Sequence, residues 1–100
     1  MKELVIPPAA QSDEDSWELL RAWVANNGLH CSVLVGVYDA EGITEELAWG
    51  TILADAARHI ADAIESLGLR DNEAALVAIR QAFNAELDKP TSSRSGNLVQ

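Results

Sequence analysis

The sequence predicts an α+β fold in which a β-hairpin, with or without a short N-terminal third strand, packs against two amphipathic α-helices. Two β-rich runs flank Asn27-Gly28, a dipeptide that suits the positive φ angles of a tight turn. Further along, apolar residues recur every three or four positions over two long stretches, which is typical of amphipathic helices. The 100 residues suit a single domain over residues 1–90, followed by a flexible, Ser-rich tail over residues 91–100.

The N-terminal segment begins with the apolar run Leu4-Val5-Ile6. Pro7 and Pro8 end this run, because proline has no amide donor and restricts the residue before it. The run alone leaves two alternatives open, an edge strand and an extended arm. Residues 11–16 are polar and acidic, so we expect a loop there.

The hairpin is predicted within residues 17–37, with Asn27 and Gly28 as its two turn residues. This register places Val24 opposite Cys31 and Trp23 opposite Ser32. One face of the hairpin is then apolar, and we expect the helices to cover it. Its members are Leu20, Ala22, Val24, Cys31, Val33 and Val35.

Two helices are predicted after a loop at residues 38–42. The first begins near Thr44, a suitable N-cap, and stops at Gly68. The second begins after Asp71 or Asn72 and is ended by Pro90. Each helix has one apolar stripe that we expect to be buried. The stripes are Trp49, Leu53, Ala56, Ile60, Ile64 and Leu67 in the first helix, and Leu76, Ile79, Phe83 and Leu87 in the second.

Charge and composition exclude several classes of partner. Acidic residues outnumber basic ones 16 to 7, giving a net charge of −9, and the few Lys and Arg are scattered. Binding of nucleic acid or an anionic membrane needs a basic patch, so we expect neither partner. No apolar stretch is long enough to span a membrane, no export signal is visible, and the lone Cys31 cannot form an internal disulfide. A cytoplasmic protein is therefore expected.

A cluster on the first helix is the most suggestive of chemistry. Asp55, Arg58, His59 and Asp62 share one helical face. In one interpretation Asp55, His59 and Asp62 bind a divalent metal, or Arg58 and His59 bind a small ligand. In the other they form a solvated face with weak ion pairs. We favour the second, because a zinc site needs further N or S ligands, and we assign no metal, cofactor or catalytic residue.

Three residues on the mixed face of the hairpin are candidates for binding a partner: Arg21, Trp23 and His30. Tryptophan is enriched at binding hot spots, and Trp23 lies away from the face that the helices are expected to cover. The alternative is that the N-terminal arm covers Trp23. Cys31 is expected to be structural, because a thiol in apolar surroundings has a raised pKa and is inert.

Several segments carry a family resemblance: residues 2–8 (KELVIPP), 19–24 (LLRAWV), 28–30 (GLH), 48–50 (AWG), 53–55 (LAD) and 57–60 (ARHI). Together they resemble a bacterial family of small proteins, domain of unknown function family 5076, over roughly residues 1–67. The resemblance implies a stand-alone small protein with no assigned activity, cofactor or catalytic residue. It does not extend to the second helix or the tail.

A hairpin leaves unpaired strand edges, and pairing of these edges between two copies would hide them. We therefore predict a homodimer, with a monomer as the alternative. The predicted function is a non-enzymatic protein-interaction or regulatory module that acts as this dimer on a protein partner. The alternative is a metal-binding or small-molecule-binding protein, or an enzyme, that uses the Asp/Arg/His face of the first helix.

Overall fold

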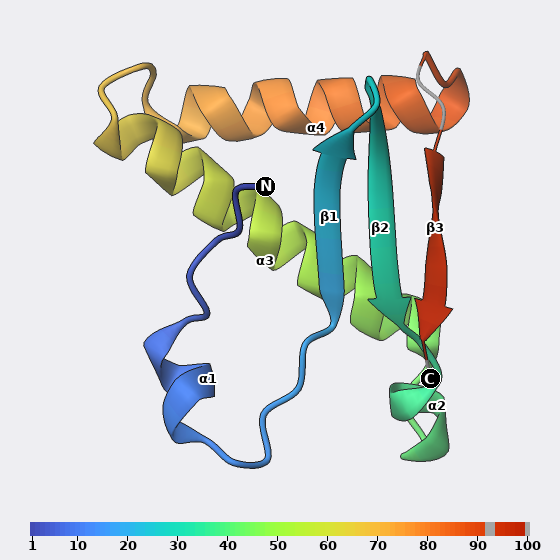
Figure 1. Cartoon of the computed structure of the whole chain (residues 1–100). Helices are drawn as coiled ribbons and strands as arrows, with labels where there is room; N and C mark the ends of the chain where they lie inside the picture. The colour runs from blue at the N-terminus through green and yellow to red at the C-terminus, as the bar shows by residue number, and fades with distance from the viewer. Residues whose placement is uncertain (92–93, 100) are drawn as a thin grey trace.

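The computed structural model describes residues 1–91 and 94–99, and Figure 1 shows its elements. In chain order they are α1 (Pro8–Ser12), β1 (Leu20–Ala25), β2 (Gly28–Leu34), α2 (Val37–Ala40), α3 (Glu45–Ser66), α4 (Asn72–Asp88) and β3 (Arg94–Val99). The predicted α+β fold, with a hairpin and two long helices, is confirmed. None of the helices among the described residues has the length and apolar character needed to cross a bilayer.

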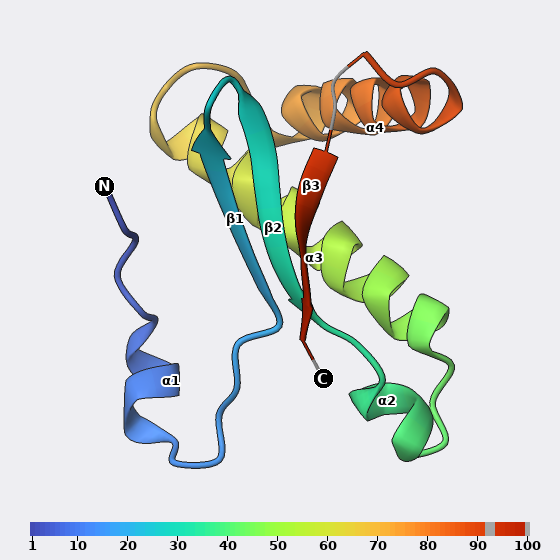
Figure 2. The same ribbon diagram turned by 45° about the vertical axis from the view of Figure 1, so that its right-hand side comes forward.

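The three strands form one sheet in the order β1-β2-β3. β1 runs antiparallel to β2, and β3 runs parallel to β2. α3 passes obliquely behind the strands, and α4 lies at the level of the hairpin turn (Figures 1 and 2). The sheet therefore has one face that α3 crosses and one face without a helix.

The third strand is β3 and not the N-terminal run, which corrects one alternative of the prediction. Residues 1–7 form an extended arm without strand pairing, and the short helix α1 follows it. The last two residues of α1 fall in the segment 11–16 that was expected to be a loop, and residues 13–16 lie outside any helix or strand. Strand β3 is an element that the sequence analysis did not anticipate within residues 91–100. The flexibility expected there stays a prediction, and residues 92, 93 and 100 lie outside the described residues.

The hairpin turn lies one residue earlier than predicted. Asn26 and Asn27 form the turn with φ angles of 50° and 59°, and Gly28 already pairs with Ala25. The register is therefore shifted by two residues, so that Trp23 lies opposite His30 and not opposite Ser32. Because side chains alternate along a strand, a shift of two leaves every residue on its predicted face.

The apolar face that we expected the helices to cover is left open on β1. Leu20, Ala22 and Val24 are exposed, and Val24 retains 83% of its accessible surface. Trp23 points to the other face and is the half-buried residue of β1. On β1 the face that holds Trp23 is thus the more covered one, whereas on β2 residues of both faces, such as His30 and Cys31, are half-buried.

A buried carboxylate joins α2 to α3. Glu45, the first residue of α3, is only 5% exposed. Its side chain accepts hydrogen bonds from the backbone N–H of Asp39 at 3.1 Å and from the indole N–H of Trp49 at 2.9 Å. In return, the Asp39 carboxylate accepts a hydrogen bond from the backbone N–H of Glu45 at 3.3 Å. This exchange holds α2 in place, in a segment where the sequence analysis expected a loop.

The hydrogen bonds at Glu45 also set its charge state. Burial of the carboxylate would by itself raise its pKa. The backbone N–H groups of Asp39, Gly36 and Tyr38 and the indole of Trp49 outweigh this effect, and the pKa of Glu45 lies below its ordinary value. Glu45 is therefore a charged group inside the fold.

Both long helices begin and end as predicted. Asp71 caps α4, since its carboxylate accepts a hydrogen bond from the backbone N–H of Ala74 at 2.7 Å. Thr44 precedes α3 but makes no side-chain capping bond. Gly68, with a φ of 74°, follows the end of α3 and adopts the left-handed conformation that glycine tolerates.

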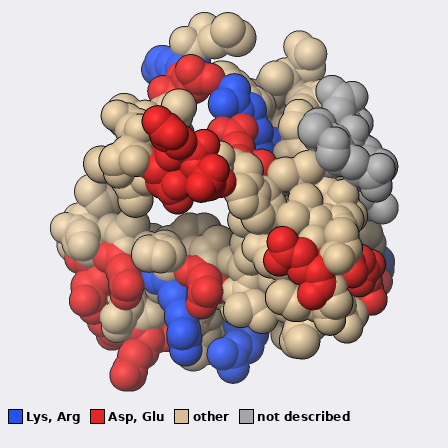
Figure 3. Space-filling view, turned by 90° about the horizontal axis from the view of Figure 1, so that it is seen from below, with Lys and Arg blue, Asp and Glu red and all other residues tan. Residues whose placement is uncertain are grey.

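The single chain buries very few side chains. Among the described residues the buried apolar side chains are Ala61 and Ala75, one on each long helix, and no large side chain is fully buried. The accessible surface is 8406 Å², whereas a compact protein of this mass exposes about 5,500 Å². The radius of gyration is 15.3 Å, against about 13 Å for a compact domain of this length. The space-filling view is accordingly deeply hollowed (Figure 3).

Candidate functional site

One concave feature is a groove between the N-terminal half of α3 and the middle of α4. The two helices diverge from their connecting loop, so the space between them widens along the pair (Figure 1). The groove has a volume of about 710 Å³. Its large apolar side chains are Leu47, Leu53, Leu76, Ile79 and Phe83. We refer to this feature as the α3–α4 groove.

Small residues of α3 form part of the wall of the α3–α4 groove. Gly50, Ala54 and Ala57 line it at helical spacing, and the next residue of the series is the buried Ala61. This second stripe on α3 differs from the stripe of large residues that the sequence analysis selected. The repetition of glycine and alanine every three or four positions was the signal for it. The buried Ala61 lies where the two helices meet, whereas a Cβ added at Gly50 would contact nothing within 4 Å, so the stripe is open at that end.

The apolar residues of the groove remain exposed to solvent. The exposed fractions are 67% for Leu47, 48% for Phe83 and 40% for Leu53. Leu53 and Phe83 were both predicted to be buried, so their stripes are only partly covered. Single exposed apolar residues are ordinary, but a continuous apolar groove marks an interaction surface.

The charges in the α3–α4 groove cancel. Its charged members are Glu46, Asp55, Arg58 and Arg80, two of each sign, in a chain whose net charge is −9. The groove is therefore an electrically neutral area of an otherwise acidic protein.

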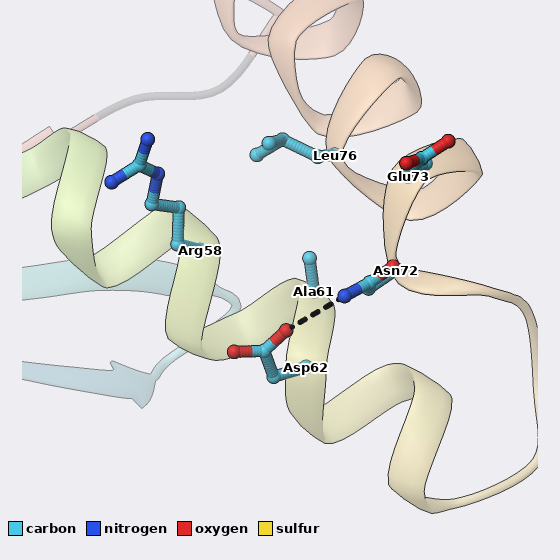
Figure 4. A pocket seen from close by; sticks show the side chains of 6 residues that line it. All are labelled: Arg58, Ala61, Asp62, Asn72, Glu73 and Leu76. Carbon is cyan, nitrogen blue, oxygen red and sulfur yellow. Dashed lines mark hydrogen bonds between the residues drawn. The ribbon is translucent and has the colours of Figure 1, made fainter.

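A smaller pocket of about 270 Å³ lies beside Ala61 (Figure 4). Arg58 and Asp62 reach it from α3, and Asn72, Glu73 and Leu76 from α4. The side-chain amide of Asn72 donates a hydrogen bond to Asp62 at 3.1 Å, and its backbone N–H donates to Glu65 at 2.9 Å. These bonds hold the start of α4 against α3 and fix the polar wall of the pocket.

The structure separates the polar cluster predicted on the first helix. Asp55 and Arg58 line the α3–α4 groove, and Arg58 and Asp62 line the small pocket, whereas His59 lines neither of the two. All four side chains are exposed. Over residues 1–91 and 94–99, no three or more His, Cys, Asp or Glu side chains gather in a way that could hold a metal ion.

The three residues predicted to bind a partner occupy the more covered face of the hairpin. Trp23 and His30 form a cross-strand pair, both half-buried, and His30 Nε2 lies 3.0 Å from the carbonyl oxygen of Ala25. Arg21 makes ion pairs of 2.9 Å with Glu18 and with Glu3 of the N-terminal arm. The hydrogen bond from Arg21 lowers the pKa of Glu18 below its ordinary value. Arg21 therefore ties the arm to β1.

The lone cysteine was expected to be a structural residue of the apolar face. Cys31 is a half-buried free thiol on β2, opposite Ala22. It lies on the same face as the exposed Leu20 and Val24. The coverage expected for this face is therefore incomplete, since it is missing at Leu20 and Val24 of β1 but partly present at Cys31.

These features define a small α+β protein in which one long helix crosses a three-stranded sheet and a second helix diverges from the first. A family model described as Domain of unknown function (DUF5076) matches residues 3–91. The chain belongs to this family. The match confirms the resemblance noted in the sequence and extends it beyond residue 67 to include α4. A comparison with curated proteins gave no match.

A solved structure shares the fold of this chain. It is described as that of a "putative pyruvate dehydrogenase from the photosynthetic bacterium Rhodopseudomonas palustrus CGA009". The two sequences are 33% identical, and the structures superpose with a TM-score of 0.67. The similarity covers 93% of this chain and 90% of that chain.

Proposed function

We propose that the protein is a non-enzymatic interaction module that acts as a homodimer on a protein partner in the cytoplasm. The observation that carries the proposal is the large apolar surface left open by the isolated chain. Its total accessible surface, polar and apolar together and with the extended arm of residues 1–7 included, exceeds that of a compact protein of equal mass by about 2,900 Å². A stable protein–protein interface covers about 800 Å² on each partner. The excess therefore supplies more surface than one such interface requires.

The exposed apolar residues support association because they lie on several elements. Beyond the α3–α4 groove, Val24 of β1 is 83% exposed and Leu67, just after α3, is 75% exposed. In the arm, Leu4 is 92% exposed and Val5 is 83% exposed. Monomeric proteins rarely leave apolar patches larger than a few hundred Å² in contact with water. Association with another protein would remove this apolar surface from water, which is favourable.

Charge favours a particular kind of partner for the dimer. The acidic surface repels nucleic acid and anionic lipid, and it attracts a basic protein surface at long range. Arg21, Trp23 and His30 stay the sheet residues that we assign to a partner, and they would contact it through the parts of the half-buried Trp23 and His30 that remain exposed, next to the Arg21 that is paired with Glu3 and Glu18. In this proposal the dimer contact is apolar, and the acidic surface attracts the partner at long range.

The test is the mass of the protein in solution. Sedimentation equilibrium from about 1 to 100 μM should give twice the chain mass of 10.8 kDa at the upper end of the range. The dimer should persist at high salt, because burial of apolar surface does not weaken with ionic strength. A chain that stays monomeric at all these concentrations would refute the proposal.

A second candidate function is the binding of a small ligand at the pocket of Arg58 and Asp62. The observation in its favour is the 33% identity to a structure whose description names pyruvate dehydrogenase. Arg58 presents a guanidinium suited to a carboxylate such as that of pyruvate, and Asp62 an oxygen suited to a divalent metal. Calorimetric titration with pyruvate, Mg²⁺, Mn²⁺ and Zn²⁺ separates the candidates. Heat of pyruvate binding that Arg58→Ala abolishes would establish this function, and no heat with pyruvate or with any of the three metals would discard it.

A further inference from the structure

We infer that the α3–α4 groove is one half of a two-fold symmetric interface, and that the C-terminal half of α4 from a second copy of the chain occupies it. This inference rests on the proposed homodimer and states which surface forms it. Three properties of the groove lead to it: its exposed apolar side chains, its balanced charge and the apolar continuation of α4 beyond it.

The first property is the position of the exposed apolar side chains. Leu47 and Leu53 come from α3 and Phe83 from α4, so both walls offer apolar surface to whatever enters. The width between the walls results from the divergence of the helices (Figure 1). A third helix that fills the gap would contact both walls at once, as helices do in a bundle.

The second property is charge. Two copies that each carry −9 repel one another over most of their surface. In the groove, Arg58 and Arg80 offset Glu46 and Asp55. This neutral area is where two copies can approach without repulsion. In a symmetric contact the arginines of one copy can pair with the carboxylates of the other. A basic partner gains nothing from a neutral groove and would bind the acidic surface elsewhere.

The third property identifies the segment that enters. Leu87 lies one turn beyond Phe83 on the same face of α4 and is 67% exposed. The apolar face of α4 thus runs from the groove wall into solvent. A two-fold axis through the groove would place each α4 against the α3 of the other copy. Because such an interface uses the same patch twice, each chain supplies both the groove and the helix that fills it.

The test compares two substitutions on α4 by sedimentation velocity. Phe83→Glu puts a charge into the groove, and we expect it to weaken the dimer by roughly thirtyfold or more. Val77→Glu is the matched control, because Val77 is 55% exposed on the same helix but does not line the groove. It should leave the dimer intact. A folded Phe83→Glu protein that dimerises as well as wild type would overturn the inference.

A second pair of variants covers the case in which Phe83→Glu does not fold. Arg80→Glu and Arg70→Glu change the net charge of the chain equally, but only Arg80 lines the groove. We expect about tenfold weaker association for Arg80→Glu and less than twofold for Arg70→Glu at physiological salt. Equal effects of the two would overturn the inference. A wild-type chain that is monomeric throughout refutes the proposed function itself, whereas a wild-type dimer insensitive to both groove substitutions refutes only the interface.

Discussion

Replacing Asp71 by alanine should lower the free energy of unfolding by about 1 kcal/mol, the usual cost of losing an N-cap. The Asp71 carboxylate accepts a short hydrogen bond of 2.7 Å from the backbone N–H of Ala74. Without it, one of the free N–H groups in the first turn of α4 loses its partner, and a favourable charge leaves the positive end of the helix. For a chain of this length, 1 kcal/mol corresponds to a fall in melting temperature of about 4–8 °C.

Two substitutions serve as controls in the same thermal unfolding assay, monitored by circular dichroism at one fixed protein concentration. Asp71→Asn keeps an acceptor at the cap and should retain most of the stability. Asp88→Ala removes the same side chain from the last residue of α4, where a negative charge opposes the helix dipole. It should raise stability by a few tenths of a kcal/mol. If Asp71→Ala melts at the wild-type temperature, the cap contributes nothing and the explanation given for the start of α4 is wrong.

Three further predictions concern pH, the arm and association. The pKa of Glu45 is lowered in the folded chain, so the free energy that its charge adds to folding is complete above the ordinary value of 4.5 and is lost as the pH falls through the folded pKa. Glu45→Gln should therefore flatten this part of a plot of unfolding free energy against pH. Arg21→Gln releases Glu3, so it should speed limited proteolysis within residues 1–7 while leaving the melting temperature unchanged. Unchanged cleavage would contradict the role of Arg21 in holding the arm. In the proposed dimer, a hundredfold rise in protein concentration adds about 2.7 kcal/mol per dimer to the apparent free energy of unfolding and raises the melting temperature. A melting temperature that does not change with concentration would argue against association.

The hairpin shows how far the sequence determines the fold. Its existence and its two faces were predictable, because the alternation of side chains survives a shift of two residues. The turn itself was not, since Asn26-Asn27 and Asn27-Gly28 overlap and both tolerate the positive φ angles that the turn requires. Which face is covered was also beyond the sequence, because Trp23 on one face and Val24 on the other are both apolar. That choice depends on how α3 packs across the strands.

The groove was harder to predict than the helices that form it. The spacing of large residues on α3 every three or four positions predicted that Leu53 and Ile60 are buried, but they are 40% and 52% exposed. The packing of α3 against α4 uses the smaller side chains instead. The Asp/Arg/His face was predicted with the correct helical geometry, but one helix cannot show which neighbouring residues complete a site. Asn72, which binds Asp62 from the start of α4, is such a residue.

The two buried alanines bear on how this chain is stabilised. Hydrophobic stabilisation grows with the apolar area removed from water, and Ala61 and Ala75 have the smallest apolar side chains. The residues with more to contribute, such as Leu47, Phe83 and Leu87, keep about half or more of their surface exposed in the single chain. If a second copy covers them, much of the free energy of folding is gained on association, and folding and dimerisation become one equilibrium. Dilution would then unfold the protein as it separates the two copies. In Phe83→Glu, the helical circular dichroism signal should likewise fall as the dimer is lost.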